Sequence, residues 1–97
     1  MLTGKQRSNL KKMAQELKPT VMIGKEEVTD GVVSSIDNYL TAHELVKVQI
    51  QEGAMLDPKE TANELAEELG AEYVQAIGRR FVLYRQAPDP DKRKIIL

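Results

Sequence analysis

The sequence of 97 residues contains no cysteine and no tryptophan. Without cysteine the chain has neither a disulfide framework nor a zinc site built on thiolates, which fits a reducing compartment. No apolar run approaches the length of a membrane span, and the N-terminus lacks the charged-then-apolar order of a signal peptide. We therefore expect a cytoplasmic protein that does not engage a membrane.

Residues that carry enzymatic chemistry are also scarce. The single histidine, His43, falls near the end of a predicted helix, where a cation is favourable, so helix capping explains it better than catalysis. No Gly-x-Ser-x-Gly nucleophile and no Gly-x-x-x-x-Gly-Lys phosphate loop occurs. The four glutamates between residues 60 and 68 have no histidine at ligand spacing and are typical of a solvated helix face. We expect no enzymatic activity, no cofactor, no metal and no small-molecule substrate.

Aromatic residues make up only 4% of the chain, which argues against an aromatic base-stacking platform of the kind found in RRM domains. Apolar residues, in contrast, make up 41%, so the chain has enough of them for one compact domain with a single core. Nothing in this composition leaves a spare apolar face, and we expect a monomer.

Charge is plentiful and unevenly distributed. The net charge is −1, but residues 1–25 carry +5, residues 26–75 carry −10, and residues 76–97 carry +4. Basic residues gathered in space form an electrostatic footprint for phosphate. Charged helix faces also serve solubility, and composition alone leaves these two interpretations about even.

Hydrophobic periodicity and turn residues predict three helices and four strands. Each helix has apolar residues at three- and four-residue spacing and a recognisable cap, whereas the strands are short apolar or alternating runs. In chain order these elements are a helix from the Thr3–Gln6 capping box to about Leu17, a strand over 21–23, a helix after the N-cap Thr29, a strand over 46–50, a helix between Asp57 and Gly70, and two strands over 73–77 and 80–85.

The order α-β-α-β-α-β-β predicts an α/β fold of the α+β, two-layer type, with a four-stranded mixed sheet packed with helices. Strand–helix–strand units favour parallel pairing, whereas the final hairpin must be antiparallel. The loop Gly78-Arg79 fits a type II′ turn. Residues 1–86 form the predicted single domain, and the Pro-, Asp- and Lys-rich residues 87–97 a tail that we expect to be mobile.

Three groups of residues are candidates for RNA contact. On the first helix Arg7, Lys11 and Lys18 fall along one line, with Lys5 and Lys12 further round, and such a row can follow a phosphate backbone. The alternative is a solvated face whose stems cover the edge of the core, and the row favours RNA modestly over it.

The second group is Gly24-Lys25, between a strand and a helix N-terminus, where backbone N–H groups can bind an anion. An ordinary strand-to-helix turn explains one glycine better, and the neighbouring Glu26 and Glu27 oppose phosphate. The third group is Arg79 and Arg80 at the hairpin tip, where guanidinium groups can contact phosphate and stack on bases. Charges at such an edge also keep a sheet soluble.

Taken together, the chain resembles the CRM (YhbY-like) family of RNA-binding proteins, whose single-domain bacterial members are ribosome-assembly factors. The resemblance covers nearly the whole chain up to Arg85. It is carried by Leu2-Thr3-Gly4-Lys5-Gln6-Arg7, Val21-Met22-Ile23-Gly24-Lys25, Val28-Thr29-Asp30-Gly31-Val32, His43-Glu44-Leu45-Val46-Lys47-Val48 and Val74-Gln75-Ala76-Ile77-Gly78-Arg79-Arg80-Phe81-Val82-Leu83-Tyr84-Arg85.

The resemblance implies a fold similar to the C-terminal domain of bacterial translation initiation factor three, with the last strand inserted between the second and third. It implies association with precursors of the large ribosomal subunit, while plant relatives carry the domain in intron-splicing factors. The family's GxxG loop, compared with that of KH domains, corresponds here to residues 24–27. Glu27 stands where the second glycine is expected, which weakens the case for close backbone approach there.

We therefore expect a protein that binds ribosomal RNA of large-subunit precursors and acts in ribosome assembly. Its contacts would be to phosphate, with RNA shape supplying selectivity. The expected RNA-binding residues are Lys5, Arg7, Lys11, Lys12, Lys18, Gly24, Lys25, Arg79, Arg80 and Arg85. The alternative is a non-catalytic protein–protein adaptor on the ribosome that uses the acidic helices. One continuous basic face would favour RNA, and basic residues scattered among carboxylates would favour the adaptor.

Overall fold

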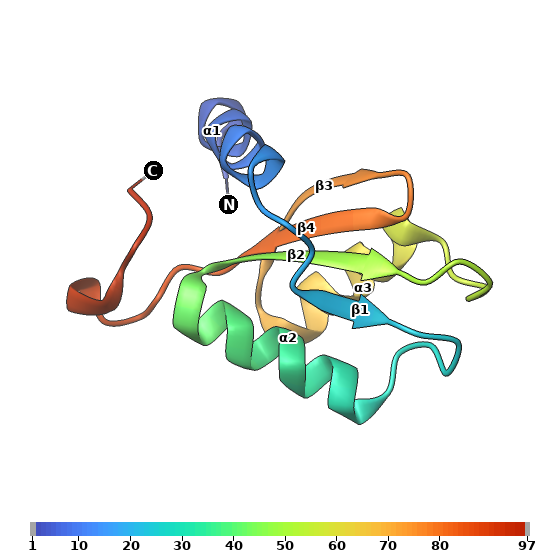
Figure 1. The fold of residues 1–97 in the computed structure, drawn as a ribbon. Helices are drawn as coiled ribbons and strands as arrows, with labels where there is room; N and C mark the ends of the chain where they lie inside the picture. Colours follow the sequence, from blue (N-terminus) through green and yellow to red (C-terminus); the bar gives the residue numbers. More distant parts are fainter. Residues whose placement is uncertain (1, 97) are drawn as a thin grey trace.

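The computed structural model describes residues 2–96, which form three α-helices, four strands and one short 3-10 helix. All seven predicted elements are present in the predicted order (Figure 1). They are α1 (Gly4–Gln15), β1 (Val21–Ile23), α2 (Asp30–His43), β2 (Leu45–Ile50), α3 (Pro58–Leu69), β3 (Glu72–Ile77), β4 (Arg80–Tyr84) and the 3-10 helix η1 (Pro90–Lys92).

The predicted helix caps form with little change. Thr3 and Gln6 make the reciprocal capping box of α1, and the side chains of Thr29 and Asp57 accept backbone hydrogen bonds at the starts of α2 and α3. Gly70 ends α3 in the left-handed conformation. The regular part of α1 ends at Gln15, two residues before the predicted end, although the N–H of Leu17 still turns back to the carbonyl of Ala14.

The sheet is mixed and has the strand order β1-β2-β4-β3. β1 pairs with β2 in parallel, and β4 is antiparallel to both of its neighbours. β4 therefore lies between β2 and β3, as the family resemblance implies. The hairpin turn has Gly78 at φ 60°, and Ile77 pairs directly with Arg80, which leaves the two-residue loop that the sequence predicts.

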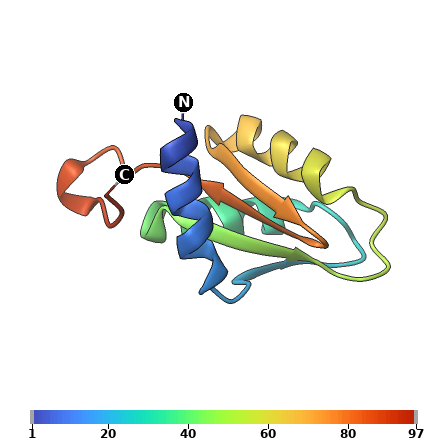
Figure 2. The ribbon, with the colours of Figure 1, turned by 90° about the horizontal axis from the view of Figure 1, so that it is seen from above.

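Helices cover both faces of this sheet, so the two-layer expectation describes only part of the molecule. α2 and α3 pack on one face around a core that includes Ile36, Val48 and Phe81. α1 crosses the other face and packs on a second, smaller cluster that includes Leu10 and Val82 (Figures 1 and 2). The difference arises because successive strand residues point to opposite faces, and β2, β3 and β4 carry apolar residues on both.

α1 covers only half of its face. Seen from above, it crosses the strands near the chain termini and leaves the hairpin end of the sheet uncovered (Figure 2). The segments that follow β1, β2 and β3 all leave the sheet at that uncovered end, because β1 is parallel to β2, and β2 and β3 are both antiparallel to the intervening β4.

The predicted mobile tail, residues 87–97, is described up to Ile96 and lies against the opposite end of the sheet (Figure 1). Ile95 is buried beside Leu10 and Ala14 of α1. The carboxylate of Glu44, itself 1% exposed, accepts the backbone N–H groups of residues 87, 94 and 95. These contacts join the tail to the domain in this structure, and its mobility stays a prediction.

Candidate nucleic-acid interface

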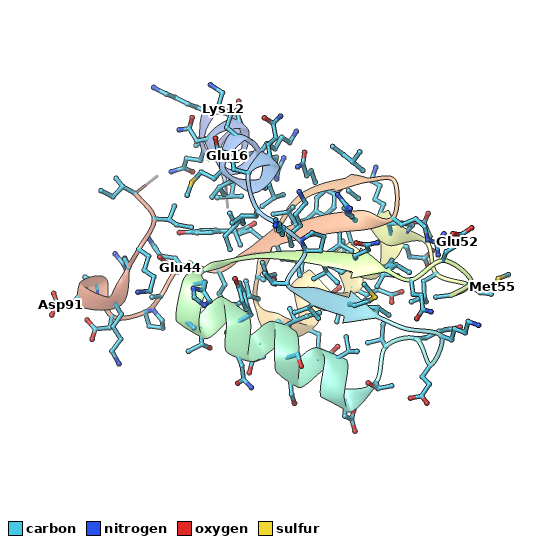
Figure 3. The ribbon with its side chains drawn as sticks, viewed as in Figure 1. Lys12, Glu16, Glu44, Glu52, Met55 and Asp91 are labelled. Atoms are coloured by element: carbon cyan, nitrogen blue, oxygen red, sulfur yellow. The ribbon has the colours of Figure 1, made fainter. Side chains whose placement is uncertain are left out.

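The two faces of the sheet carry opposite charge. α1 contains four basic residues and no carboxylate, whereas α2 and α3 together contain six carboxylates and one lysine. The segregation seen along the sequence is therefore a segregation in space, with the basic helix on one side of the sheet and the acidic helices on the other. The carboxylate of Glu16, which directly follows α1, is the exception on the basic side (Figure 3).

α1 is held on the sheet by Lys47, a residue that the sequence did not single out for this role. Its Nζ donates to the carbonyl oxygens of Ala14 at 3.0 Å and Leu17 at 3.1 Å. Ala14 belongs to the last turn of α1 and Leu17 directly follows the C-cap, so the cation complements the negative end of the helix dipole. The Lys47 ammonium group thus fixes the position of α1 on the sheet. It thereby also fixes the position of the basic side chains that α1 carries.

The basic side chains of the α1 segment differ in their surroundings. Those of Lys5, Lys11, Lys12 and Lys18 are exposed and form no ion pair or hydrogen bond with another described residue. Arg7 is half-buried, and its Nε lies away from solvent without a partner among residues 2–96. Four of them project from α1 itself, whereas Lys18 lies beyond the end of the helix, so the predicted row on α1 is reduced to Arg7 and Lys11.

The row lies on the flank of α1 that borders the uncovered half of the sheet. At about 100° per residue, Arg7, Lys11 and Gln15 fall on one flank and Gln6 on the other. Gln15 lines a groove with the hairpin residues, whereas Gln6 lines a hollow beside the tail. The flank that carries Arg7 and Lys11 therefore faces the hairpin end. Lys12 projects outward, away from the sheet (Figure 3).

Four residues on this face form one row across the uncovered end of the sheet. Met22 pairs with Gln49, Gln49 with Arg80, and Arg80 with Ile77. Arg80 is exposed, and its side chain has no hydrogen bond or ion pair with any described residue. Met22 and Ile77 are 55% and 68% exposed. The predicted contact residue Arg80 is thus accessible from the same side as α1.

The Gly24–Glu27 loop lies at this end of the molecule and is a closed turn. The N–H of Glu27 donates to the carbonyl of Gly24 at 2.9 Å. Glu27 has φ 63°, so the chain adopts at this position a left-handed conformation that glycine accepts without strain. The departure from the family pattern therefore changes the side chain while the backbone keeps a glycine-like conformation.

The loop between β2 and α3 lies next to this turn. The aliphatic stem of Lys25 passes beside Gly53. Lys25 itself is exposed, as are the neighbouring Glu26 and Glu27. Lys25 is therefore accessible to a ligand, but two carboxylates stand close to it in the chain.

Arg79 differs from the expectation of two free guanidinium groups at the hairpin tip. Its Nε donates to the carbonyl of Ile50 at 3.2 Å, and its Nη2 donates to the carbonyls of Gln51 and Ala54 at 2.9 and 3.0 Å. These bonds tie the hairpin to the loop between β2 and α3, so Arg79 has a structural role. Its Nη1 carries no hydrogen bond to a described residue.

Arg85 lies apart from the other candidates. It follows β4 at the end opposite the hairpin and forms an ion pair with Asp37 at 2.8 Å. It also donates to the carbonyls of Leu69 and Asp37 and to the hydroxyl of Thr41. Its guanidinium thereby joins the second half of α2 to the C-terminal end of α3 on the acidic side of the sheet.

Of the ten predicted contact residues, nine lie on or beside the α1 face or at its hairpin end. One of these nine, Arg79, is engaged in internal hydrogen bonds. The tenth, Arg85, lies at the opposite end of the sheet. Hydropathy patterns gave no sign of these internal bonds, because they depend on carbonyl groups from segments far away in the chain.

Among residues 2–96 there is no group of three histidine, aspartate or glutamate residues placed to hold a metal ion, and no helix long and apolar enough to cross a membrane.

Comparison with known proteins identifies the family. The family model of the CRS1/YhbY (CRM) domain matches residues 2–85. This chain belongs to the CRM domain family. An RNA-binding protein of Haemophilus influenzae is 40% identical over 89 residues, which cover 91% of this chain and 89% of that protein. The CRM domain here therefore includes every helix and strand from α1 to β4.

Two further bacterial relatives agree with this assignment. The Bacillus subtilis protein YqeI, named a probable RNA-binding protein, is 35% identical over 92% of this chain and 93% of its own length. A probable RNA-binding protein of Pseudomonas aeruginosa is 31% identical over 94% of this chain and 88% of its own length. The solution structure of a hypothetical protein from Staphylococcus aureus matches with a TM-score of 0.80 and 34% identity, over 99% of this chain and all of that one.

Proposed function

We propose that this CRM protein binds ribosomal RNA of large-subunit precursors with the α1 side of its sheet and acts in ribosome assembly as a monomer. The observation that carries the proposal is the placement of unpartnered basic side chains. Lys5, Lys11, Lys12, Lys18 and Arg80 lie on one side of the sheet, and the carboxylates of α2 and α3 lie on the other.

Phosphate is the group that such an arrangement recognises. Lysine and arginine side chains that project from a fixed helix can neutralise successive phosphates and release their counterions. Contacts of this kind position a protein without reading sequence, so the shape of the RNA supplies the selectivity. The acidic side of the molecule repels the same backbone, which restricts binding to one orientation.

The choice of large-subunit RNA rests on the family resemblance, because single-domain bacterial members associate with those precursors. A cytosolic location follows from the same proposal. The adaptor alternative is less well supported, because it requires basic residues scattered among carboxylates, whereas the basic helix α1 contains no carboxylate.

Crosslinking the full-length protein to RNA in growing cells, followed by sequencing of the crosslinked fragments, tests the proposal. We expect fragments of large-subunit ribosomal RNA, recovered from particles that sediment more slowly than the mature subunit. Replacing Lys11 and Arg80 together by glutamate should remove these fragments. The matched control is Lys59→Glu on the acidic side, which should leave them unchanged. Fragments spread over messenger and small-subunit RNA would contradict the proposal, as would particle association that survives the Lys11→Glu and Arg80→Glu exchange.

A further inference from the structure

The uncovered end of the sheet has a second property besides its charge. The row Met22, Gln49, Arg80 and Ile77 presents a guanidinium between an amide and an apolar side chain, with a second apolar side chain at the far edge. Directly opposite side chains on neighbouring strands lie about 5 Å apart, so the four form one continuous surface. Resting on the RNA binding proposed above, we propose that this row holds an unpaired nucleotide, with its base laid flat across Arg80.

The chemistry of the row fits the face of a base. A guanidinium is planar and weakly hydrated and stacks on aromatic rings. Arg80 has no hydrogen bond or ion pair with any described residue, so its plane is available. Met22 and Ile77 are among the most exposed large apolar side chains of the sheet. An arginine plane with apolar neighbours thus supplies the stacking surface that the low aromatic content denies to the chain.

The groove beside the row fits the edge of a base. It has a volume of about 420 Å³ and lies between α1 and the hairpin. Three amide side chains line it, those of Gln15, Gln49 and Gln75. An amide both donates and accepts hydrogen bonds, which suits the mixed donors and acceptors of a base edge. The NH₂ of an amide can also donate to a phosphate, but its carbonyl oxygen can only accept, and a base edge offers N–H donors whereas a phosphate offers none.

An unpaired nucleotide fits this surface better than a duplex or a protein. Within a duplex both faces of each base are covered by their neighbours, and only an unpaired base offers a free face. An apolar protein partner would bury the Arg80 guanidinium without an acceptor, at a considerable cost in free energy. The exposed lysines Lys18 and Lys25, which precede and follow β1, supply cations for the flanking phosphates.

The test compares RNA strands that differ only in one base. We would measure the affinity of the full-length protein for an eight-nucleotide single strand of mixed sequence by fluorescence anisotropy, and then for strands in which each nucleotide in turn is abasic. The wild type should bind at least one abasic strand about tenfold more weakly, which is the usual range for one stacked base. The phosphate number is unchanged in this series, so the charge contribution is held constant.

Variants of the row should remove this difference. Arg80→Lys keeps the charge and loses the plane, so it should bind the intact strand about tenfold more weakly and no longer distinguish the abasic one. Met22→Ser with Ile77→Ser should reduce the difference in part. Met55→Ser is the matched control, because Met55 is an exposed apolar side chain in the loop between β2 and α3, outside the row (Figure 3).

Three results would overturn the inference. If all abasic strands bound the wild type as tightly as the intact strand while binding stayed salt-dependent, phosphate binding would stand and the base site would not. If no RNA bound at all, the proposed function would fail together with the inference. If the Met22→Ser and Ile77→Ser variant bound every RNA normally but no longer co-sedimented with ribosomal particles, the row would contact a protein instead.

Discussion

Arg80 and Arg85 bracket β4, and their surroundings differ in every respect. Arg80, at the hairpin end, is exposed on the α1 side and has no partner among the described residues. Arg85, at the tail end, forms an ion pair with Asp37 and hydrogen bonds to two carbonyls and a hydroxyl. The comparison shows that Arg85 holds the fold together at the tail end, whereas at the hairpin end Arg79 takes the internal hydrogen bonds and Arg80 stays available to a ligand.

Glu44 extends the same contrast to the carboxylates. It is buried at the tail end and accepts three backbone N–H groups, while the glutamates near the Gly24 turn are exposed. Burial raises the pKa of Glu44, but the three N–H donors and the charge of Arg93 outweigh it, so the pKa lies below its ordinary value. Burial, and then the Glu44 carboxylate, raise the pKa of Tyr84.

The largest effect is expected at Glu44. Glu44→Gln should lower the free energy of unfolding by about 3 kcal/mol, because hydrogen bonds to a charged acceptor are lost and an amide NH₂ is turned toward buried N–H donors. Urea denaturation followed by circular dichroism measures this change, with the exposed Glu64→Gln as the control. RNA affinity of the folded protein should not change. Equal stability of the two variants would mean that Glu44 does not anchor the tail.

The same carboxylate makes stability depend on pH. Its pKa is lower in the folded than in the unfolded chain, so its contribution is present above about pH 4.5 and is lost as the pH falls through the folded value. The stability difference between the wild type and Glu44→Gln should therefore be constant near neutral pH and shrink below about pH 4.5. A difference that stayed constant in acid would contradict the lowered pKa.

The two arginines should separate binding from folding. Arg80→Glu should weaken RNA binding by more than about tenfold, because it loses the guanidinium plane and reverses the charge, and it should leave the midpoint of urea denaturation unchanged, because the side chain forms no hydrogen bond or ion pair with a described residue. Arg85→Ala should lower the free energy of unfolding by about 2 kcal/mol and leave RNA affinity unchanged, because its hydrogen bonds are internal. If Arg80→Glu and Arg85→Ala changed RNA affinity equally and also changed the free energy of unfolding equally, the hairpin end and the tail end of the sheet would not differ in role.

A smaller effect is expected at the Gly24–Glu27 turn. Glu27→Gly removes a carboxylate near Lys25 and relieves a left-handed backbone, so RNA affinity should rise about threefold, with a slight gain in stability. Glu27→Gln is the matched control, since it removes the charge and keeps the strain. If both variants bound RNA as the wild type does, the turn would lie outside the interface.

Sequence analysis recovered the seven elements, their order and the mixed sheet, because caps, periodicity and the Gly78 turn are local signals. The position of β4 between β2 and β3 came from the family resemblance. Local patterns gave no indication that α1 covers the second face of the sheet. An amphipathic sequence shows that a helix packs against something, but it does not show which surface the helix packs on. They also treated Arg79, Arg80 and Arg85 alike, because their partners, such as Asp37 and the carbonyl of Ala54, are distant in the chain.

The most direct test of the central claim is the salt dependence of RNA binding. With roughly four to six phosphates neutralised by the α1 side, log affinity should fall against log salt with a slope of about −3 to −5. Replacing Lys11 and Lys12 by alanine should weaken binding to every RNA and make the slope shallower by about one or two units, with thermal stability unchanged. Tight binding with a flat salt dependence in the wild type would contradict the claim that the basic side of the sheet binds RNA.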